Sequence, residues 1–431
     1  MTGFDDAPRS DVRRARFASR PPVGVRGQRT EQRILAAALQ VFGQEGYHRT
    51  GIAQITEVTG GSRASFYRYF SSKEDVFRHL AGQVARQLAA AAEAVGEVTP
   101  DDAGRAEVRG WVARHAEIHA RYEPVFRLYR TATRDDPVMA AEAAPITSRL
   151  VGLLASRVSA TSLPARQLEP VLSLLIGSVT HTHGLATAFV NAAPDVFTDA
   201  RIEAALTDAI HRTLFGRIAG VNDIAPEHPS APRFTFDAPG RELLATAGPP
   251  DDLTAAGQRM YDTLIEAGRA AYVERGHDAT RVDDVVGAAG VSHGTFYRHF
   301  RSVDDLAGHL AALAMRHVGA AMASLPTSTE AATAATLRAW LREFHATASI
   351  EAAVLHTWTT ASAVTGQVNS QSPPVLDWGR RRIAAMLAGR GFGDVDADAI
   401  FGLAVLNSLS TTPSPATAID AAVTVIRRAL L

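Results

Sequence analysis

Residues 290–300 read Gly-Val-Ser-His-Gly-Thr-Phe-Tyr-Arg-His-Phe, and residues 60–70 read Gly-Gly-Ser-Arg-Ala-Ser-Phe-Tyr-Arg-Tyr-Phe. The two stretches lie 230 residues apart and share a glycine, a serine two positions later and an aromatic end. Around them, residues 28–80 align without a gap to residues 258–310, with 15 identities in 53 positions. A repeat of this length is too long for a solenoid unit, so it indicates duplication of a whole module.

Each copy predicts three short helices. Apolar residues lie on one helical face in residues 34–42 and again in residues 264–272. Thr50 and Thr280 are expected to cap the second helix, since threonine is a favoured N-cap residue. That helix ends at a glycine in each copy, and Ser62 or Ser292 then caps a third helix. The buried face of the third helix is predicted to carry four phenylalanines: Phe66, Phe70, Phe296 and Phe300. A short helix, a glycine turn and a capped helix describe a helix-turn-helix.

These residues resemble the DNA-binding domain of the TetR family of transcriptional regulators, over about fifty residues in each copy. The resemblance implies an all-α fold of two tandem units that form an intramolecular pseudo-dimer. Each unit would hold a three-helix helix-turn-helix domain and a helical ligand-binding and dimerisation domain. The family's four-helix bundle would correspond here to residues 165–190 with 199–217 and 396–410 with 416–431. The predicted domains are a basic arm (1–25), DNA-binding domain 1 (26–83), regulatory domain 1 (84–219), a proline-rich linker (220–255), DNA-binding domain 2 (256–312) and regulatory domain 2 (313–431).

The resemblance also implies DNA contacts on and around the third helix of each copy. Base edges are assigned to four side chains near its start: Arg63, Ser65, His293 and Thr295. Phosphate contacts are assigned to Thr50, Tyr67, Tyr69, Lys73, Thr280, Tyr297 and His299, and the caps Ser62 and Ser292 belong to the same surface. Val303 replaces the lysine found at Lys73, and Arg301 is expected to compensate for it.

Charge is uneven along the chain, although the formal net charge is only −1. Residues 1–80 hold thirteen basic and eight acidic residues, whereas residues 256–310 hold six basic and eight acidic ones. The first copy is therefore expected to supply most of the electrostatic affinity for an asymmetric operator. A second possibility is that copy two serves only as a structural partner. The arginines between positions 9 and 26 form either a minor-groove arm or a solvated tail.

A small-molecule pocket is expected in the helical halves. Its candidate lining consists of aromatic and histidine residues at helical spacing: Trp111, His115, His119, Tyr122, Phe126, His181, His183, Trp340, Phe344 and Trp358. Aromatic residues at this spacing more often belong to a packed core. His115 and His119 also have the i, i+4 spacing of metal ligands, but no carboxylate pattern accompanies them, so neither a metal nor a cofactor is predicted.

Other functional classes find little support. The chain has no cysteine, which excludes disulfides and thiolate metal sites. No catalytic motif with a known mechanism is present, so an enzyme is not predicted. The first thirty residues lack an apolar core, and no long apolar run occurs, which predicts a cytoplasmic, nucleoid-associated protein. The resulting hypothesis is a ligand-responsive regulator of transcription that acts as a monomeric pseudo-dimer on double-stranded DNA. Repression is the family default, and the effector is expected to be an apolar or aromatic small molecule.

Overall fold

The computed structural model describes residues 25–47, 49–128, 137–224, 228, 231, 233–234, 253–275, 280–365, 372–412 and 415–431. Side chains are described for these residues except 137–143, 353, 356–365 and 372–373. Within these ranges the chain folds into helices joined by turns, with one isolated parallel bridge between Val98 and Val158. The predicted all-α class is therefore confirmed. None of the described helices is long and apolar enough to cross a membrane.

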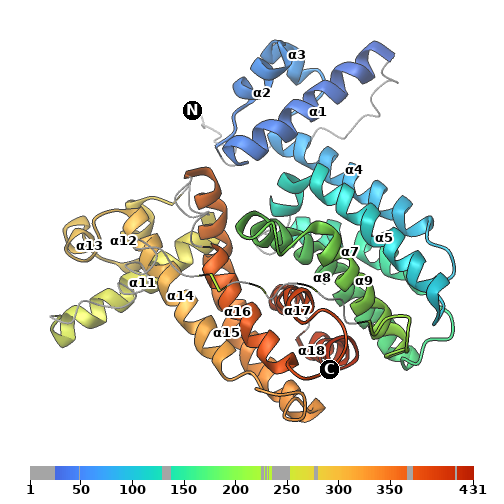
Figure 1. Ribbon diagram of the computed structural model, residues 1–431. Helices are drawn as coiled ribbons and strands as arrows, with labels where there is room; N and C mark the ends of the chain where they lie inside the picture. Colours follow the sequence, from blue (N-terminus) through green and yellow to red (C-terminus); the bar gives the residue numbers. More distant parts are fainter. Residues whose placement is uncertain are drawn as a thin grey trace, which may run out of the picture.

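Two small helical heads stand apart on a larger helical body (Figure 1). The first head consists of α1 (Val25–Glu45), α2 (Ile52–Thr59) and α3 (Arg63–Tyr67), and the second head consists of α11 (Ala255–Arg275), α12 (Val282–Ala289) and α13 (His293–His299). The apolar faces predicted for α1 and α11 are buried, because they close over Phe66 and Phe296 of the third helices and over Phe70 and Phe300, which follow those helices. The duplication seen in the sequence is thus a duplication of this fold.

One long helix joins each head to the body. In the first half this helix is α4 (Lys73–Glu93), and in the second half it is α14 (Val303–Ala323). Each begins under its head and continues without a break past the domain boundary expected near residue 83 or 312. Head and body therefore share a rigid element in each half.

The body contains the remaining helices. In the first half these are α5 (Asp102–Arg121), α7 (Pro137–Ala155), α8 (Ala165–Ala192) and α9 (Asp199–Phe215), and in the second half they are α15 (Ala334–Thr365), α16 (Ser372–Leu387), α17 (Val395–Ser410), α18 (Pro415–Val425) and the π-helical end η1 (Ile426–Leu430). Helices α8 and α9 pack against α17, α18 and η1. We call these helices the central bundle. It is formed within one chain, as the sequence predicted, and one apolar core runs through both halves.

Buried arginine–aspartate pairs join the two halves of the central bundle. Arg212 of α9 is fully buried and donates to Asp398 of α17, to the Asn222 carbonyl at 2.7 Å and to the Ala429 carbonyl at 2.7 Å. Arg201 of α9 donates from Nε to Asp394, which precedes α17, at 2.6 Å. Burying such charges is tolerable because every guanidinium is matched by a carboxylate or a carbonyl.

The described part of the predicted linker is anchored to the body. The Ala231 amide donates to Asp396 at 2.9 Å, and the Phe234 amide donates to Asp377 at 3.0 Å. The Phe234 ring packs on Phe189 of α8, at 6.2 Å between ring centroids. These contacts fix residues 231 and 234 to the body. The basic arm up to residue 24 and most of the linker lie outside the described residues.

Candidate nucleic-acid interface

The turn between the second and third helix has the same geometry in both heads. Gly60 and Gly290 adopt left-handed backbone angles, with φ of 64° and 65°, a region that favours glycine. The Ser65 amide then donates to Ser62 Oγ at 3.1 Å, and the Thr295 amide donates to Ser292 Oγ at 3.2 Å. Both predicted serine caps are confirmed. Together these features fix how α3 and α13 leave the turn.

The third helices bury one face and expose the other. The four predicted phenylalanines are at most 1% exposed, and the two in each head lie 5.9 Å and 5.8 Å apart between ring centroids. Phe66 and Phe296 belong to the third helices as predicted, whereas Phe70 and Phe300 lie just after the helices end. Tyr67 and Tyr297 are each 56% exposed, with their rings edge-on to Phe66 and Phe296. The matching exposure shows that both heads present the same outward face. Tyr69 and His299 are half-buried beside it.

The capping role predicted for Thr50 and Thr280 is wrong. The N-cap positions are Gly51 and Arg281, one residue later in each copy. Their amides donate to side chains in the first turn, Gly51 to Gln54 at 2.7 Å and Arg281 to Asp284 at 2.8 Å. Both threonines are 2% exposed, and their hydroxyls donate back to the Gly46 carbonyl at 2.7 Å and the Ala271 carbonyl at 3.3 Å. Phosphate contact by these two hydroxyls stays a prediction.

The Lys73 side chain connects the start of α4 to the segment between α1 and α2. Its Nζ donates to the Tyr47 carbonyl at 3.0 Å and the Thr50 carbonyl at 3.2 Å, and it lies 4.6 Å from the centre of the Tyr47 ring. Burial lowers the pKa of its ammonium group. In the second head Val303 stands in its place, and its carbonyl accepts from the Tyr272 hydroxyl at 2.8 Å. The expected substitute, Arg301, is 91% exposed and pairs with Asp305 at 2.9 Å.

The base-edge candidates differ between the heads. Arg63 is exposed at the first position of α3, and its side chain makes no hydrogen bond or ion pair with a residue that the structure describes. His293 Nε2 lies 2.6 Å from Asp283 Oδ1, in an exposed pair between α13 and α12. Ala53 occupies the position of Asp283 in the first head. Sequence reasoning missed Asp283, although an acid in the helix before the recognition helix was a visible signal. Ser65 is half-buried, and the Thr295 hydroxyl lies 3.0 Å from the Ser292 hydroxyl.

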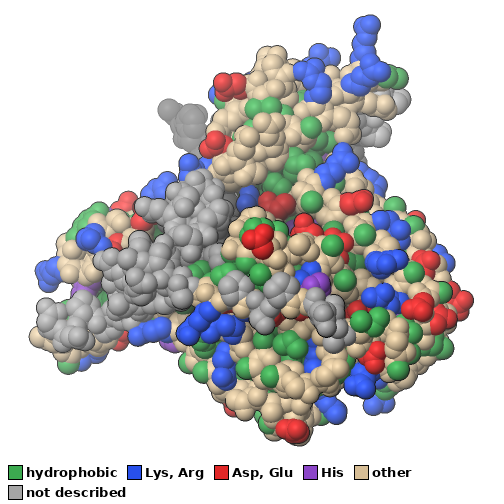
Figure 2. Space-filling model, in the orientation of Figure 1, with side chains coloured by type: hydrophobic (Ala, Val, Ile, Leu, Met, Phe, Trp, Pro, Cys, Tyr) green, Lys and Arg blue, Asp and Glu red, His purple; other side chains and the backbone are tan. Residues whose placement is uncertain are grey.

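The heads also differ in charge. Residues 26–80 carry eight basic and five acidic residues, against six basic and eight acidic ones in residues 256–310. Figure 2 shows Lys and Arg side chains projecting from the top of the first head. The first head therefore carries the more positive net charge, which is the sign that attracts phosphate groups.

Several predicted pocket residues meet in the first half, but they form a packed cluster. The rings of His115 and His183 stack at 5.2 Å between centroids, and His119 stacks on Phe126 at 4.9 Å. Trp111 lies edge-on to His115 at 5.9 Å. Burial lowers the pKa of His115 well below its usual value and that of His183 to about 4, so both rings are neutral at pH 7. No group of three possible metal ligands occurs among the described residues.

The other pocket candidates lie elsewhere. His181 Nδ1 is 2.8 Å from the Gly177 carbonyl of its own helix, and the Tyr122 hydroxyl accepts from Gln87 of α4 at 2.8 Å. In the second half Trp340 stacks on Phe344 at 5.2 Å and donates to the Ala321 carbonyl at 2.9 Å, within the core. The side chain of Trp358 lies outside the described residues. The cavity beside Trp111 is apolar and measures only about 30 Å³. Tyr122, by contrast, lines a larger cleft of about 400 Å³ next to the first head.

Two helix-turn-helix heads on one helical body define a tandem helix-turn-helix protein. The family described as "Bacterial regulatory proteins, tetR family" matches twice, at residues 34–80 and 264–310. The chain therefore carries the N-terminal domain of the tetR family in duplicate.

Similar proteins include the HTH-type transcriptional repressor AcnR of Corynebacterium diphtheriae, 33% identical over 100 residues, which are 22% of this chain and 53% of that protein. The HTH-type transcriptional regulator RutR of Escherichia coli K12 is 32% identical over 96 residues, 22% of this chain and 44% of that protein. The HTH-type transcriptional regulator LuxR of Vibrio harveyi is 32% identical over 72 residues, 17% of this chain and 35% of that protein. The chain thus spans about half or less of the length of these relatives.

Proposed function

We propose that this protein is a DNA-binding regulator of transcription that reads one operator with two unlike heads in a single chain. The observation that carries the proposal is the pair of recognition helices, α3 and α13, with identically exposed outer faces on one body. Such helices place their first residues against base edges in the major groove. The relatives are named as transcriptional regulators, which supports this class over an enzyme, and AcnR is named as a repressor, which favours repression.

The chain acts as a monomer in this proposal. In a dimeric helix-turn-helix protein, a second copy supplies the second head. Here the central bundle brings the second head to the same body, and Arg212 and Arg201 pair across it with Asp398 and Asp394. DNA binding would then show no dependence on a dimerisation equilibrium, because the second head is already present at a high effective concentration.

The operator is asymmetric in this proposal. Arg63 offers an uncompensated guanidinium, which suits bidentate pairing with a guanine. His293 is paired with Asp283, whose carboxylate repels nearby phosphates. The half-site read by the first head therefore contributes more of the affinity and more of its salt dependence.

We also propose that a small molecule regulates the DNA affinity of this protein. An effector can change DNA affinity only through its differential affinity for two head arrangements. Each head continues into the body through one helix, α4 or α14, so a ligand that shifts either helix would move a recognition helix.

The test uses the full chain and an operator selected from a pool of random duplexes. Tyr67→Ala and Tyr297→Ala are compared in binding titrations at two salt concentrations, since both side chains are equally exposed and their truncation spares the core. Loss of affinity in both variants supports two reading heads. Loss of affinity with Tyr67→Ala alone would indicate that the second head is only a structural partner. A wild-type chain that selects no duplex would refute the proposal. Footprinting of the selected site then measures its asymmetry.

A further inference from the structure

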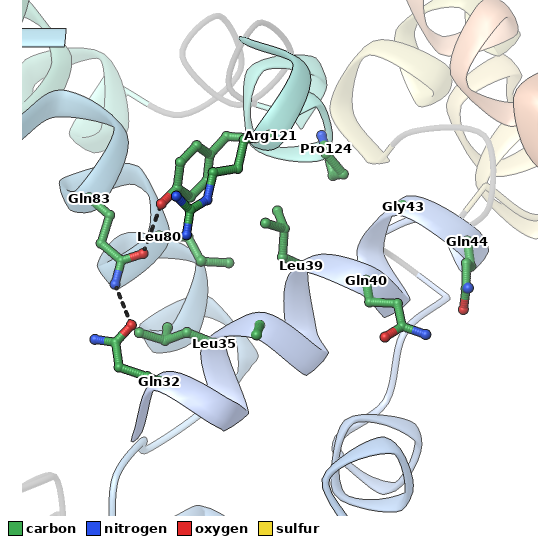
Figure 3. A pocket seen from close by; sticks show the side chains of 12 residues that line it. Gln32, Leu35, Leu39, Gln40, Gly43, Gln44, Leu80, Gln83, Arg121 and Pro124 are labelled. Carbon is green, nitrogen blue, oxygen red and sulfur yellow. Dashed lines mark hydrogen bonds between the residues drawn. The ribbon is translucent and has the colours of Figure 1, made fainter. Parts of the chain in front are cut away.

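A cleft of about 400 Å³ lies between α1 of the first head and the end of α5 (Figure 3). Its volume is in the range of small-molecule sites. Leucine side chains, including Leu39 and Leu80, make the interior apolar, and glutamines from α1 and α4 surround it. Arg121 and Pro124 lie on the side of the cleft opposite α1 (Figure 3), and Tyr122 also lines the cleft. None of the residues of the histidine–aromatic cluster (Trp111, His115, His119, Phe126 and His183) lines this cleft, so the cleft is a separate site.

The polar contacts that cross this cleft are weak. Gln83 of α4 donates to Gln32 of α1 over 3.4 Å, and the Tyr122 hydroxyl lies 3.5 Å from Gln83 Oε1 (Figure 3). Both distances are at the outer limit of a hydrogen bond. The hydrogen bonds at the Gln32 end of the cleft therefore add little to the contact between α1 and α5, whereas at the other end of α1 Arg127 donates to the Phe42 carbonyl at 3.3 Å.

One cation stands at the edge of the cleft. Arg121 is the last residue of α5, and its guanidinium lies 5.4 Å from the centre of the Tyr122 ring. It is exposed and forms no hydrogen bond or ion pair with a residue in the described part of the chain. A guanidinium at the rim of an apolar space suits a molecule with an apolar part and one carboxylate or sulfonate group.

The second half closes the equivalent junction with its own side chains. Arg269 of α11, the counterpart of Leu39, pairs with Glu351 of α15, and their side chains are only 12% and 4% exposed. Glu351 also accepts from His317 of α14 at 2.7 Å. With Trp111 and Trp340 aligned, Glu351 stands at the position of Tyr122. In the second half, the buried ion pair between Arg269 and Glu351 therefore occupies the position that corresponds to the cleft of the first half.

We propose that this cleft binds a small amphipathic organic anion, with an apolar ring or short chain between α1 and α5 and its acid group on Arg121. The bound molecule links α1 to the end of α5, as the ion pair between Arg269 and Glu351 links α11 to α15 in the second half. It thereby fixes the orientation of the first head relative to the body. The effect on DNA rests on the proposed function, whereas the binding itself does not.

Binding is tested first without DNA, with the full chain and two probes, benzoate and 1-anilinonaphthalene-8-sulfonate, by calorimetry and fluorescence. Arg121→Glu should weaken the binding of at least one probe about tenfold or more, because a charge-assisted hydrogen bond is replaced by repulsion. Ala36→Glu with Leu39→Arg copies Glu266 and Arg269 of the second half and should abolish binding by filling the cleft. Arg109→Glu, an exposed arginine on the same helix, is the matched control and should change affinity less than twofold.

Two results would overturn the proposal. The first is a wild-type chain that binds neither probe, and the second is an Arg121→Glu variant that binds both as tightly as Arg109→Glu does. A folded state in each variant is checked by circular dichroism and thermal unfolding. The probe that binds is then added to the complex with the selected operator. A change in DNA affinity that Arg121→Glu removes supports the link to the first head, and no change refutes that link. If the chain binds the probe but selects no operator, the proposed function fails while the site stands.

Discussion

Arg212 of α9 donates from one guanidinium nitrogen to both carboxylate oxygens of Asp398 of α17, each at 3.0 Å, and neither side chain reaches solvent. Arg390 pairs with the same carboxylate and donates to the Leu430 carbonyl at 2.9 Å. Burial raises the pKa of Asp398, and the two neighbouring guanidinium groups oppose that shift. This ionic centre spans residues 186 positions apart and joins the two halves of the molecule.

Asp398→Asn should destabilise the fold by about 3–5 kcal/mol, because it leaves two buried guanidinium groups without a carboxylate. Urea unfolding at pH 7 measures the change. The matched control is Asp420→Asn, which breaks the exposed pair between Arg338 and Asp420 and should cost less than about 1 kcal/mol. Similar losses in the two variants would show that the buried centre does not join the halves.

Stability should fall as the pH is lowered from about 6.5 towards 4, in part through His115 and His183. Burial lowers the pKa of His115 and brings that of His183 to about 4, below the unfolded value of about 6.5. Between these values the unfolded chain binds more protons than the folded one, so stability rises with pH. His183 alone would account for about 2 kcal/mol between pH 8 and pH 5.

The contribution of His115 is isolated by His115→Phe, which copies Phe344 of the second half. Unfolding of the variant and the wild type is measured at pH 7.5 and pH 5. A smaller loss of stability on acidification is expected for the variant, because it lacks one group that must gain a proton on unfolding. Equal losses would indicate that His115 is protonated alike in both states.

Gly290→Ala should destabilise the second head by about 1–2 kcal/mol, since alanine is strained at φ 65°. No atom lies within 4 Å of the added carbon, so the cost comes from the backbone. DNA affinity should fall as well, because the turn sets the direction of α13. Gly287→Ala, three residues earlier within α12 and equally unobstructed, should instead be neutral or stabilising by up to about 1 kcal/mol. The two variants are compared by thermal unfolding.

Asp283→Ala should raise DNA affinity about three- to tenfold at low salt, because it removes a negative charge beside His293. The reciprocal change, Ala53→Asp, should lower affinity by a similar factor through the first head. Binding titrations at two salt concentrations measure both, and each effect should shrink as salt screens the charge. An Asp283→Ala variant with unchanged affinity would mean that the second head lies away from the phosphates.

Much of each head followed from the sequence. Helical periodicity located α1 and α11, the Gly-x-Ser spacing located the turns and caps, and the phenylalanines were correctly placed in the core. Each of these features depends on neighbours within a few residues, which share one helix face or one turn. The predicted position of the threonine caps is wrong by one residue, because the buried hydroxyls of Thr50 and Thr280 donate to carbonyls of the preceding segment.

The sequence alone determined that the chain is a duplicated, all-helical, two-headed molecule, because repetition and periodicity are properties of order along the chain. Only the tertiary structure decided which charges meet: Arg212 with Asp398, His293 with Asp283, and Arg269 with Glu351. The open cleft at Leu39 likewise became visible only when α1 and α5 were placed side by side. Contacts between distant segments depend on how helices pack, and helix packing is fixed by the whole core, not by a local pattern.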